Sequence, residues 1–202
     1  GGVMTRGPLS ITVTVHGVVP EQGALRRSGA QPGDAIFVTG SLGDGALALQ
    51  QLLGKYHVAE QWWPSLLARL EQPQPRILVG MALRGLASSC LDISDGLASD
   101  LGHILRASGI GAQVELTQLP LSPALAALPS EQSWQLALAG GDDYELCFTL
   151  PEQHRGALVT ALRGTGVAVT EIGRVVSGGP VIQWLHGGSP HDLLLRGWDH
   201  FQ

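Results

Sequence analysis

The stretch LDISDGLASD, residues 91–100, constrains the fold most strongly, because it joins an apolar run to an amphipathic pattern through acidic and small residues. Apolar residues then recur at the spacing of one helix face: Leu97, Leu101, Ile104 and Leu105. We therefore expect a short strand entering at residues 89–91, then a turn and an α-helix. The side chains of Asp92, Ser94 and Asp95 would lie at the junction between strand and helix.

Two interpretations of this junction are open. The first N–H groups of a helix are unpaired and carry partial positive charge, and carboxylates suit Mg²⁺, which also takes waters and substrate phosphates. The junction could therefore hold a metal–nucleotide complex. Alternatively, Ser94 or Asp95 is simply the N-cap of the helix, which is a common role for Ser and Asp. Taken alone, the motif favours the cap.

Other apolar patterns indicate a mixed sheet. Alternating apolar and polar residues at 9–15 predict a strand with one core-facing side. A shorter apolar run at residues 35–39 leads into the glycine-rich turn GSLGDG, residues 40–45, which opens a helix. Because several later strands are close enough for hairpins, a purely parallel sheet is not expected. The sequence predicts a mixed α/β (α+β) sandwich forming a single domain over residues 1–202.

Composition limits the class of protein. The chain is 44% hydrophobic and 14% charged with a formal net charge of −5, which excludes a disordered acidic tail and a basic nucleic-acid binder. No apolar run reaches the roughly 18–20 residues that a membrane span needs. Cys90 and Cys147 lack metal-ligand spacing and are expected to be buried free thiols. We therefore expect a cytoplasmic protein with neither membrane nor nucleic-acid partners.

Two further stretches place charge at turns. Arg26 and Arg27 lie beside small residues in a polar connection, where guanidinium groups could pair with phosphate; a solvated loop is the alternative. The sequence GGDDYELCF, residues 140–148, places three acids at the mouth of an apolar strand. Such a charge cluster beside a buried strand is costly unless cations or donors meet it. A binding site and a solvated turn are therefore both open interpretations.

Four stretches taken together resemble a known family: TRGPLS at residues 5–10, RSGAQPGD at 27–34, DISDGL at 92–97 and GGDDYELCF at 140–148. With the ending GWDHF at residues 197–201, the chain resembles the C-terminal part of the bacterial thiamine-monophosphate kinases. That family shares the aminoimidazole ribonucleotide synthetase-like fold. The resemblance implies a C-terminal domain that binds ATP and substrate, with the family's N-terminal domain absent from this chain.

The same resemblance implies an activity, the transfer of the γ-phosphoryl group of ATP to thiamine monophosphate. Phosphoryl transfer depends mainly on alignment and on neutralisation of charge, and the acceptor phosphate is already anionic. No catalytic side chain is therefore expected in a metal-assisted transfer, and the implied cofactors are Mg²⁺ and the co-substrate ATP. The family also implies a homodimer built through the N-terminal domain, and this chain alone is expected to be inactive.

The resemblance assigns the candidate site residues by ligand. Asp92 and Asp95 would bind Mg²⁺, while Arg27 and Ser94 would contact ATP. Four residues would contact thiamine phosphate, the last two as secondary candidates: Asp143, Trp198, Asp142 and Tyr144.

Two features depart from the family pattern. Val3 stands where the pattern has Asp, so one expected metal ligand is missing. The family's N-terminal half, which carries further acids and part of the substrate pocket, has no counterpart in this sequence. Two alternatives to the kinase therefore stay open, namely another ATP-using enzyme of the same superfamily and a non-catalytic nucleotide-binding domain.

Overall fold

A computed structural model describes residues 11–21 and 23–195 of the chain. The strands are β1 Ala35–Thr39, β2 Ser89–Asp92, β3 Gly111–Glu115, β4 Leu146–Leu150, β5 Val169–Val176, β6 Ile182–His186 and β7 Ser189–Pro190. They form one seven-stranded sheet in the order β2-β4-β1-β5-β3-β6-β7. Neighbouring strands in this sheet pair antiparallel, except for the parallel pair β3 and β6.

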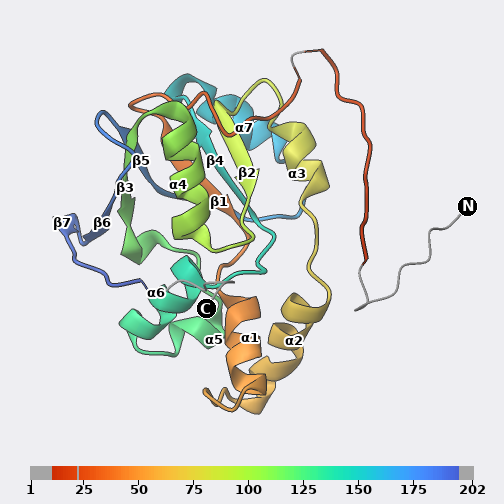
Figure 1. Cartoon of the computed structure of the whole chain (residues 1–202), viewed down its shortest axis with the longest axis vertical. Helices are drawn as coiled ribbons and strands as arrows, with labels where there is room; N and C mark the ends of the chain where they lie inside the picture. Colours follow the sequence, from red (N-terminus) through yellow and green to blue (C-terminus); the bar gives the residue numbers. More distant parts are fainter. Residues whose placement is uncertain (1–10, 22, 196–202) are drawn as a thin grey trace, which may run out of the picture.

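Helices cover the sheet on both faces. The α-helices are α1 Asp44–Leu52, α2 Trp63–Glu71, α3 Ile77–Ala82, α4 Leu97–Ser108, α5 Pro123–Ala126, α6 Ser130–Ala139 and α7 Arg155–Ala161. The 3-10 helices are η1 Glu60–Trp62, η2 Leu116–Gln118 and η3 Glu152–His154. Figure 1 shows α4 in front of the sheet and α7 behind it, with α1 and α2 packed side by side below.

Strand alternation divides the core between the two faces. Along β1, Ile36 and Val38 face the core that contains α4, whereas Ala35 and Phe37 face the core that contains α7 and part of α3. In this second core, Phe37 stacks on Phe148 with ring centroids 5.3 Å apart. The sheet is therefore buried on both faces, and the prediction of a mixed α/β sandwich is confirmed.

The state of the two cysteines and the absence of a membrane span were both expected from the sequence. Cys90 and Cys147 are free and buried, as predicted. Burial raises the pKa of the Cys90 thiol to about 12, and it raises the pKa of Cys147 as well. Among the described residues, no helix is long and apolar enough to cross a membrane.

The strand predicted at residues 9–15 is wrong over its described part, residues 11–15, which are extended without strand pairing. Ile11, Val13 and Val15 are 77%, 79% and 86% exposed. Figure 1 shows this segment running clear of the sheet on the side of α3. Alternation produces a strand only where a neighbouring strand pairs with its N–H and C=O groups, and no described strand lies beside this segment.

Candidate metal–nucleotide site

The loop after β2 and the loop before β4 lie side by side. The Ile93 N–H donates to the Glu145 carbonyl at 2.7 Å, and the Ile93 carbonyl accepts from the Tyr144 N–H at 2.8 Å. Further along, the Asp142 N–H donates to the Ser94 carbonyl at 3.0 Å. These bonds extend the antiparallel ladder of β2 and β4 past both strand ends. The two acidic stretches, far apart in sequence, therefore meet at one edge of the sheet.

Neither Ser94 nor Asp95 caps helix α4, so the N-cap interpretation is wrong. The N-cap residue is Gly96, with φ 100°, and no side chain makes a cap hydrogen bond there. The Asp100 carboxylate, in the first turn of α4, instead accepts from the Ser94 N–H at 2.9 Å and the Asp95 N–H at 3.0 Å. Because Asp100 holds the loop, the Ser94 hydroxyl and the Asp95 carboxylate are left available to a ligand.

Three carboxylates are exposed at this junction, those of Asp92, Asp95 and Asp142. Asp92 and Asp95 make no side-chain hydrogen bond or ion pair with the described residues. The Tyr144 hydroxyl donates to Asp142 Oδ1 at 3.1 Å. This hydrogen bond, followed by the charges of all three acids, raises the pKa of Tyr144. The junction is therefore an anionic surface suited to a cation.

The carboxylates at this junction fit a Mg²⁺ site in which they supply only some of the ligands. Within residues 11–21 and 23–195, no group of three or more His, Cys, Asp or Glu side chains is arranged to hold a metal ion. Mg²⁺ does not require such a group, because it usually takes one or two carboxylates and completes its shell with waters and substrate phosphates. Asp92 and Asp95 supply two such carboxylates without competing protein partners.

The backbone of the loop before β4 separates two adjacent acids. Asp142 and Tyr144 have φ 65° and φ 50°, a left-handed conformation that is uncommon outside glycine and is concentrated at functional sites. As a result, Asp142 and Tyr144 are exposed, while Asp143 between them is only 3% exposed. The residues that a ligand can reach in this loop are therefore Asp142 and Tyr144.

Asp143 points to the glycine-rich turn before α1. Both of its carboxylate oxygens accept from the Gly43 N–H at 2.9 Å. Burial raises the pKa of Asp143 to about 8; the nearby Asp44 raises it too, whereas the Gly43 N–H and Arg69 act in the opposite direction. The side chain of Asp143 therefore attaches the turn to the loop before β4.

Glu145 is the centre of a buried ionic cluster whose partners the sequence did not identify. Its carboxylate is 0% exposed and accepts from Arg76 Nε at 2.7 Å, Arg69 Nη2 at 2.9 Å and Thr39 Oγ1 at 2.5 Å. The cluster joins β1, α2 and the start of α3 to the loop before β4. Arg69 and Arg76 lie in ordinary helical and proline-rich sequence, so only the fold reveals their shared partner.

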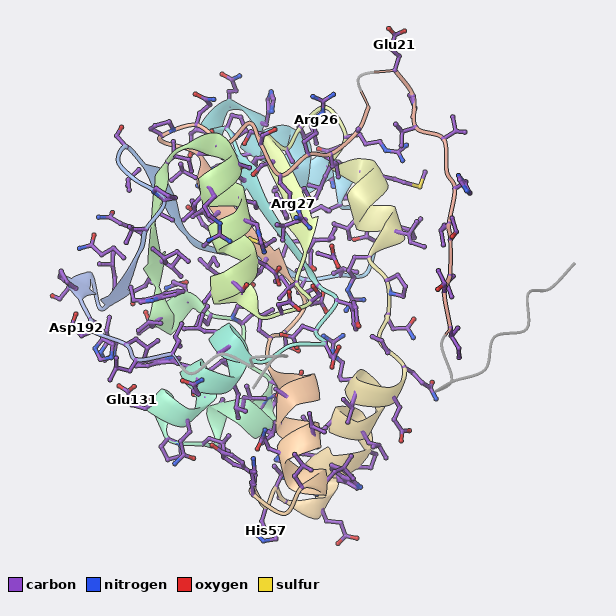
Figure 2. The ribbon with its side chains drawn as sticks, viewed as in Figure 1. Glu21, Arg26, Arg27, His57, Glu131 and Asp192 are labelled. Atoms are coloured by element: carbon purple, nitrogen blue, oxygen red, sulfur yellow. The ribbon has the colours of Figure 1, made fainter. Side chains whose placement is uncertain are left out.

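The arginine pair lies along the free edge of β2. The Cys90 N–H donates to the Arg26 carbonyl at 2.8 Å, and the Gly29 N–H donates to Ser108 Oγ at 3.2 Å. Figure 2 shows Arg26 and Arg27 between α3 and α4. Arg27 is exposed, so its guanidinium is free to reach a ligand beside β2.

The structure therefore brings together the candidates of the two acidic stretches and sets Arg27 beside the strand that leads to them. Trp198, proposed from sequence to pack on the substrate, lies outside the described residues, as does Val3. Asp143 belongs to the same loop but faces the glycine-rich turn.

Replacing Gly141 with alanine is expected to lower the free energy of unfolding by about 1–3 kcal/mol and to weaken ligand binding at the junction. A Cβ at Gly141 would lie 2.6 Å from the Ser94 carbonyl oxygen, which would force the two loops apart. Gly156→Ala is the matched control, because a Cβ there meets nothing within 4 Å. Urea denaturation measures both, and equal stability changes would contradict the tight loop contact.

A family model identifies the class of protein. It describes the AIR synthase related protein, C-terminal domain, and matches residues 31–184. The chain belongs to this family.

Individual proteins that are similar to this chain include thiamine-monophosphate kinases. The thiamine-monophosphate kinase of Escherichia coli (strain K12) is 50% identical over 203 residues, which cover 100% of this chain and 62% of that protein. The chain thus spans about 62% of the length of this relative. The crystal structure of thiamine-monophosphate kinase from Stenotrophomonas maltophilia K279a has 40% identity and a TM-score of 0.74, over 84% of this chain and 54% of that one. The structure of AaThiL complexed with AMPPCP and TMP has 32% identity and a TM-score of 0.70, over 88% and 54%.

Proposed function

We propose that this chain is the ATP- and substrate-binding domain of a thiamine-monophosphate kinase, an enzyme that transfers the γ-phosphoryl group of ATP to thiamine monophosphate. The observation that carries the proposal is the pair of unpartnered carboxylates, Asp92 and Asp95, held beside a second exposed acidic loop. The similarity of the chain to known kinases, one of them solved with AMPPCP and TMP, supports the choice of ligands. The homodimer expected of the family is part of the same proposal.

On the nucleotide side, Asp92 and Asp95 would hold Mg²⁺. When bound, this ion neutralises charge on the phosphates between which the phosphoryl group moves. The Arg27 guanidinium would pair with a nucleotide phosphate, and the Ser94 hydroxyl would donate to another phosphate oxygen. These residues would orient the donor, and orientation with charge neutralisation is the main requirement of phosphoryl transfer.

On the acceptor side, Asp142 and Tyr144 would contact thiamine phosphate, because they are the accessible residues of their loop. Their anionic surface complements the positively charged thiazolium ring of thiamine. Asp143 would support this contact indirectly by attaching the glycine-rich turn. Trp198 stays a proposed packing partner for the substrate.

The test is calorimetric titration of ATP into the chain with and without Mg²⁺. We expect binding that requires Mg²⁺ and that falls by about tenfold or more in Asp92→Asn and in Asp95→Asn, because each change removes one of two metal ligands. Asp192→Asn is the control, since Asp192 follows β7 at the opposite edge of the sheet (Figure 2) and should leave binding unchanged. Binding that ignores Mg²⁺, or that survives both substitutions, would contradict the assignment.

A further inference from the structure

Two histidines lie close together at the edge of the sheet opposite β2. His186 ends β6 and His191 follows β7, and their ring centroids are 5.7 Å apart with an interplanar angle of 80°. Because β7 is the last strand of the sheet and β2 the first, these histidines lie away from the carboxylates of Asp92 and Asp95. The proposed kinase function uses neither histidine.

The geometry of the hairpin explains why the two rings meet. Strands β6 and β7 pair antiparallel, with His186 opposite Ser189. The His191 N–H donates to the Trp184 carbonyl at 3.0 Å, which continues the ladder beyond the end of β7. Side chains two residues apart on a strand share a face, so His186 and His191 form a diagonal cross-strand pair. Both imidazoles therefore lie on one face of the hairpin.

Helix α6 packs against this pair of imidazoles. The ring of Trp134, which is 6% exposed, makes T-shaped contacts with His186 and His191 at centroid distances of 5.2 Å and 5.5 Å. Glu131, in the first turn of α6, has its Oε1 3.1 Å from His191 Nε2. An apolar floor and a carboxylate partner are the features that orient metal-binding histidines in proteins.

The arrangement suits a transition-metal ion held by two imidazoles. Imidazole nitrogen is a good ligand for Zn²⁺, Cu²⁺ and Ni²⁺. With metal–nitrogen bonds of about 2.0–2.1 Å, two imidazoles on one tetrahedral ion place their ring centroids about 5–6 Å apart. The centroids of His186 and His191 lie within this range. When His191 Nε2 donates to Glu131, the lone pair of its Nδ1 is left for a metal ion.

We propose that His186 and His191 bind one divalent transition-metal ion of the Zn²⁺ class, with Glu131 as the hydrogen-bond partner that orients His191. Water molecules complete the coordination, since the part of the chain that the structure describes has no group of three or more His, Cys, Asp or Glu side chains arranged for a metal. The two imidazoles meet only in the folded chain, so the ion stabilises the folded state. This site is separate from the proposed Mg²⁺ site.

Calorimetric titration of Zn²⁺ into the metal-free chain tests the site. Millimolar Mg²⁺ is present throughout, because it competes for carboxylates and not for imidazoles. We expect His186→Gln and His191→Gln each to lower the Zn²⁺ affinity about tenfold or more, and Glu131→Ala to lower it about tenfold. His57→Gln is the matched control, since His57 is exposed and lies at the lower end of the molecule in Figure 2, away from Glu131.

Urea denaturation gives a second readout. Zn²⁺ at about tenfold above its dissociation constant should raise the denaturation midpoint of the unmodified chain and of His57→Gln. The same concentration should leave the midpoints of His186→Gln and His191→Gln where they are. Each shift is measured against the metal-free midpoint of the same protein, so a change in basal stability does not count as a metal effect.

Zn²⁺ affinity that survives both histidine substitutions would overturn the proposal, as would an equal loss in His57→Gln. So would a loss in Asp92→Asn in place of the histidine variants, because it would assign the ion to the metal–nucleotide junction. An unmodified chain that binds no Zn²⁺ would show that the two rings only pack around Trp134. The proposed kinase function is tested separately, with Mg²⁺ and ATP.

Discussion

Replacing Glu145 with glutamine is expected to lower the free energy of unfolding by about 3–5 kcal/mol, the usual cost of removing one partner from a buried ion pair. The Glu145 carboxylate is 0% exposed, whereas the side chains of Arg69 and Arg76 are 20% and 17% exposed. A neutral amide would leave both guanidinium groups without their counterion in a poorly solvated place. Urea denaturation at neutral pH measures the loss.

Glu171→Gln is the control for this change, since it removes the same charge from an accessible pair. Glu171 lies 2.7 Å from Arg155, and both side chains are 33% exposed. Water screens such pairs, so the expected loss is at most about 1 kcal/mol. Similar losses in the two variants would contradict the special role of the buried cluster.

Arg76→Lys extends the test in case Glu145→Gln does not fold. Lysine keeps the positive charge near Glu145 but cannot reproduce the two-point contact of a guanidinium. Its expected loss lies between those of the other two variants.

Local patterns in the sequence predicted the elements that carry the site. The apolar spacing after residue 96 gave α4, which begins at Leu97 as expected, and the short apolar run at residues 35–39 is β1. Each of these two elements is determined by residues that lie within a few positions of one another in the sequence. The alternation at residues 9–15 obeys an equally clear pattern, but a strand also needs a partner, and sequence alternation does not supply one.

The candidate site shows the same limit at the level of single residues. The motif predicted that Asp92 and Asp95 lie at a strand-to-helix junction, and the structure confirms that position. It did not predict that Asp100 would hold the loop and thereby free Ser94 and Asp95 from capping. That outcome depends on a side chain a full turn into the helix.

Two adjacent acids show why the role of each residue in a motif can be assigned only from the three-dimensional structure. Asp142 and Asp143 are equivalent in sequence, but the left-handed backbone at Asp142 turns one outward and the other inward. The partners of Glu145 are 69 and 76 residues away along the chain. No local spacing connects them, so this cluster becomes visible only when α2 and α3 are placed against the sheet.

Replacing Asp143 with asparagine is expected to change how stability depends on pH. The pKa of Asp143 is about 8 in the folded chain, mainly because the carboxyl is buried, whereas an unfolded Asp has a pKa of about 3.9. Between these values the folded state holds a proton that the unfolded state has released. The stability that Asp143 contributes is therefore complete below about pH 4 and is lost as pH rises toward 8.

Asparagine mimics the neutral carboxyl and can still accept from the Gly43 N–H through its amide oxygen. Relative to the unmodified chain, Asp143→Asn should therefore gain roughly 2–4 kcal/mol of unfolding free energy between pH 5 and pH 8. Urea denaturation at several pH values measures this difference, with Asp192→Asn expected to run parallel to the unmodified chain. Burial of Glu145 acts to raise its pKa, but hydrogen bonds from Arg76 and Thr39 lower the pKa of this carboxyl below its usual value.

The same variant separates support of the turn from direct contact with substrate. If Asp143 only attaches the glycine-rich turn, Asp143→Asn keeps Gly43 in place and binds thiamine monophosphate as the unmodified chain does at pH 7. If Asp143 instead touches the substrate, binding of thiamine monophosphate by Asp143→Asn falls at pH 7. Burial at 3% exposure, with both carboxylate oxygens on one backbone N–H, favours the first result.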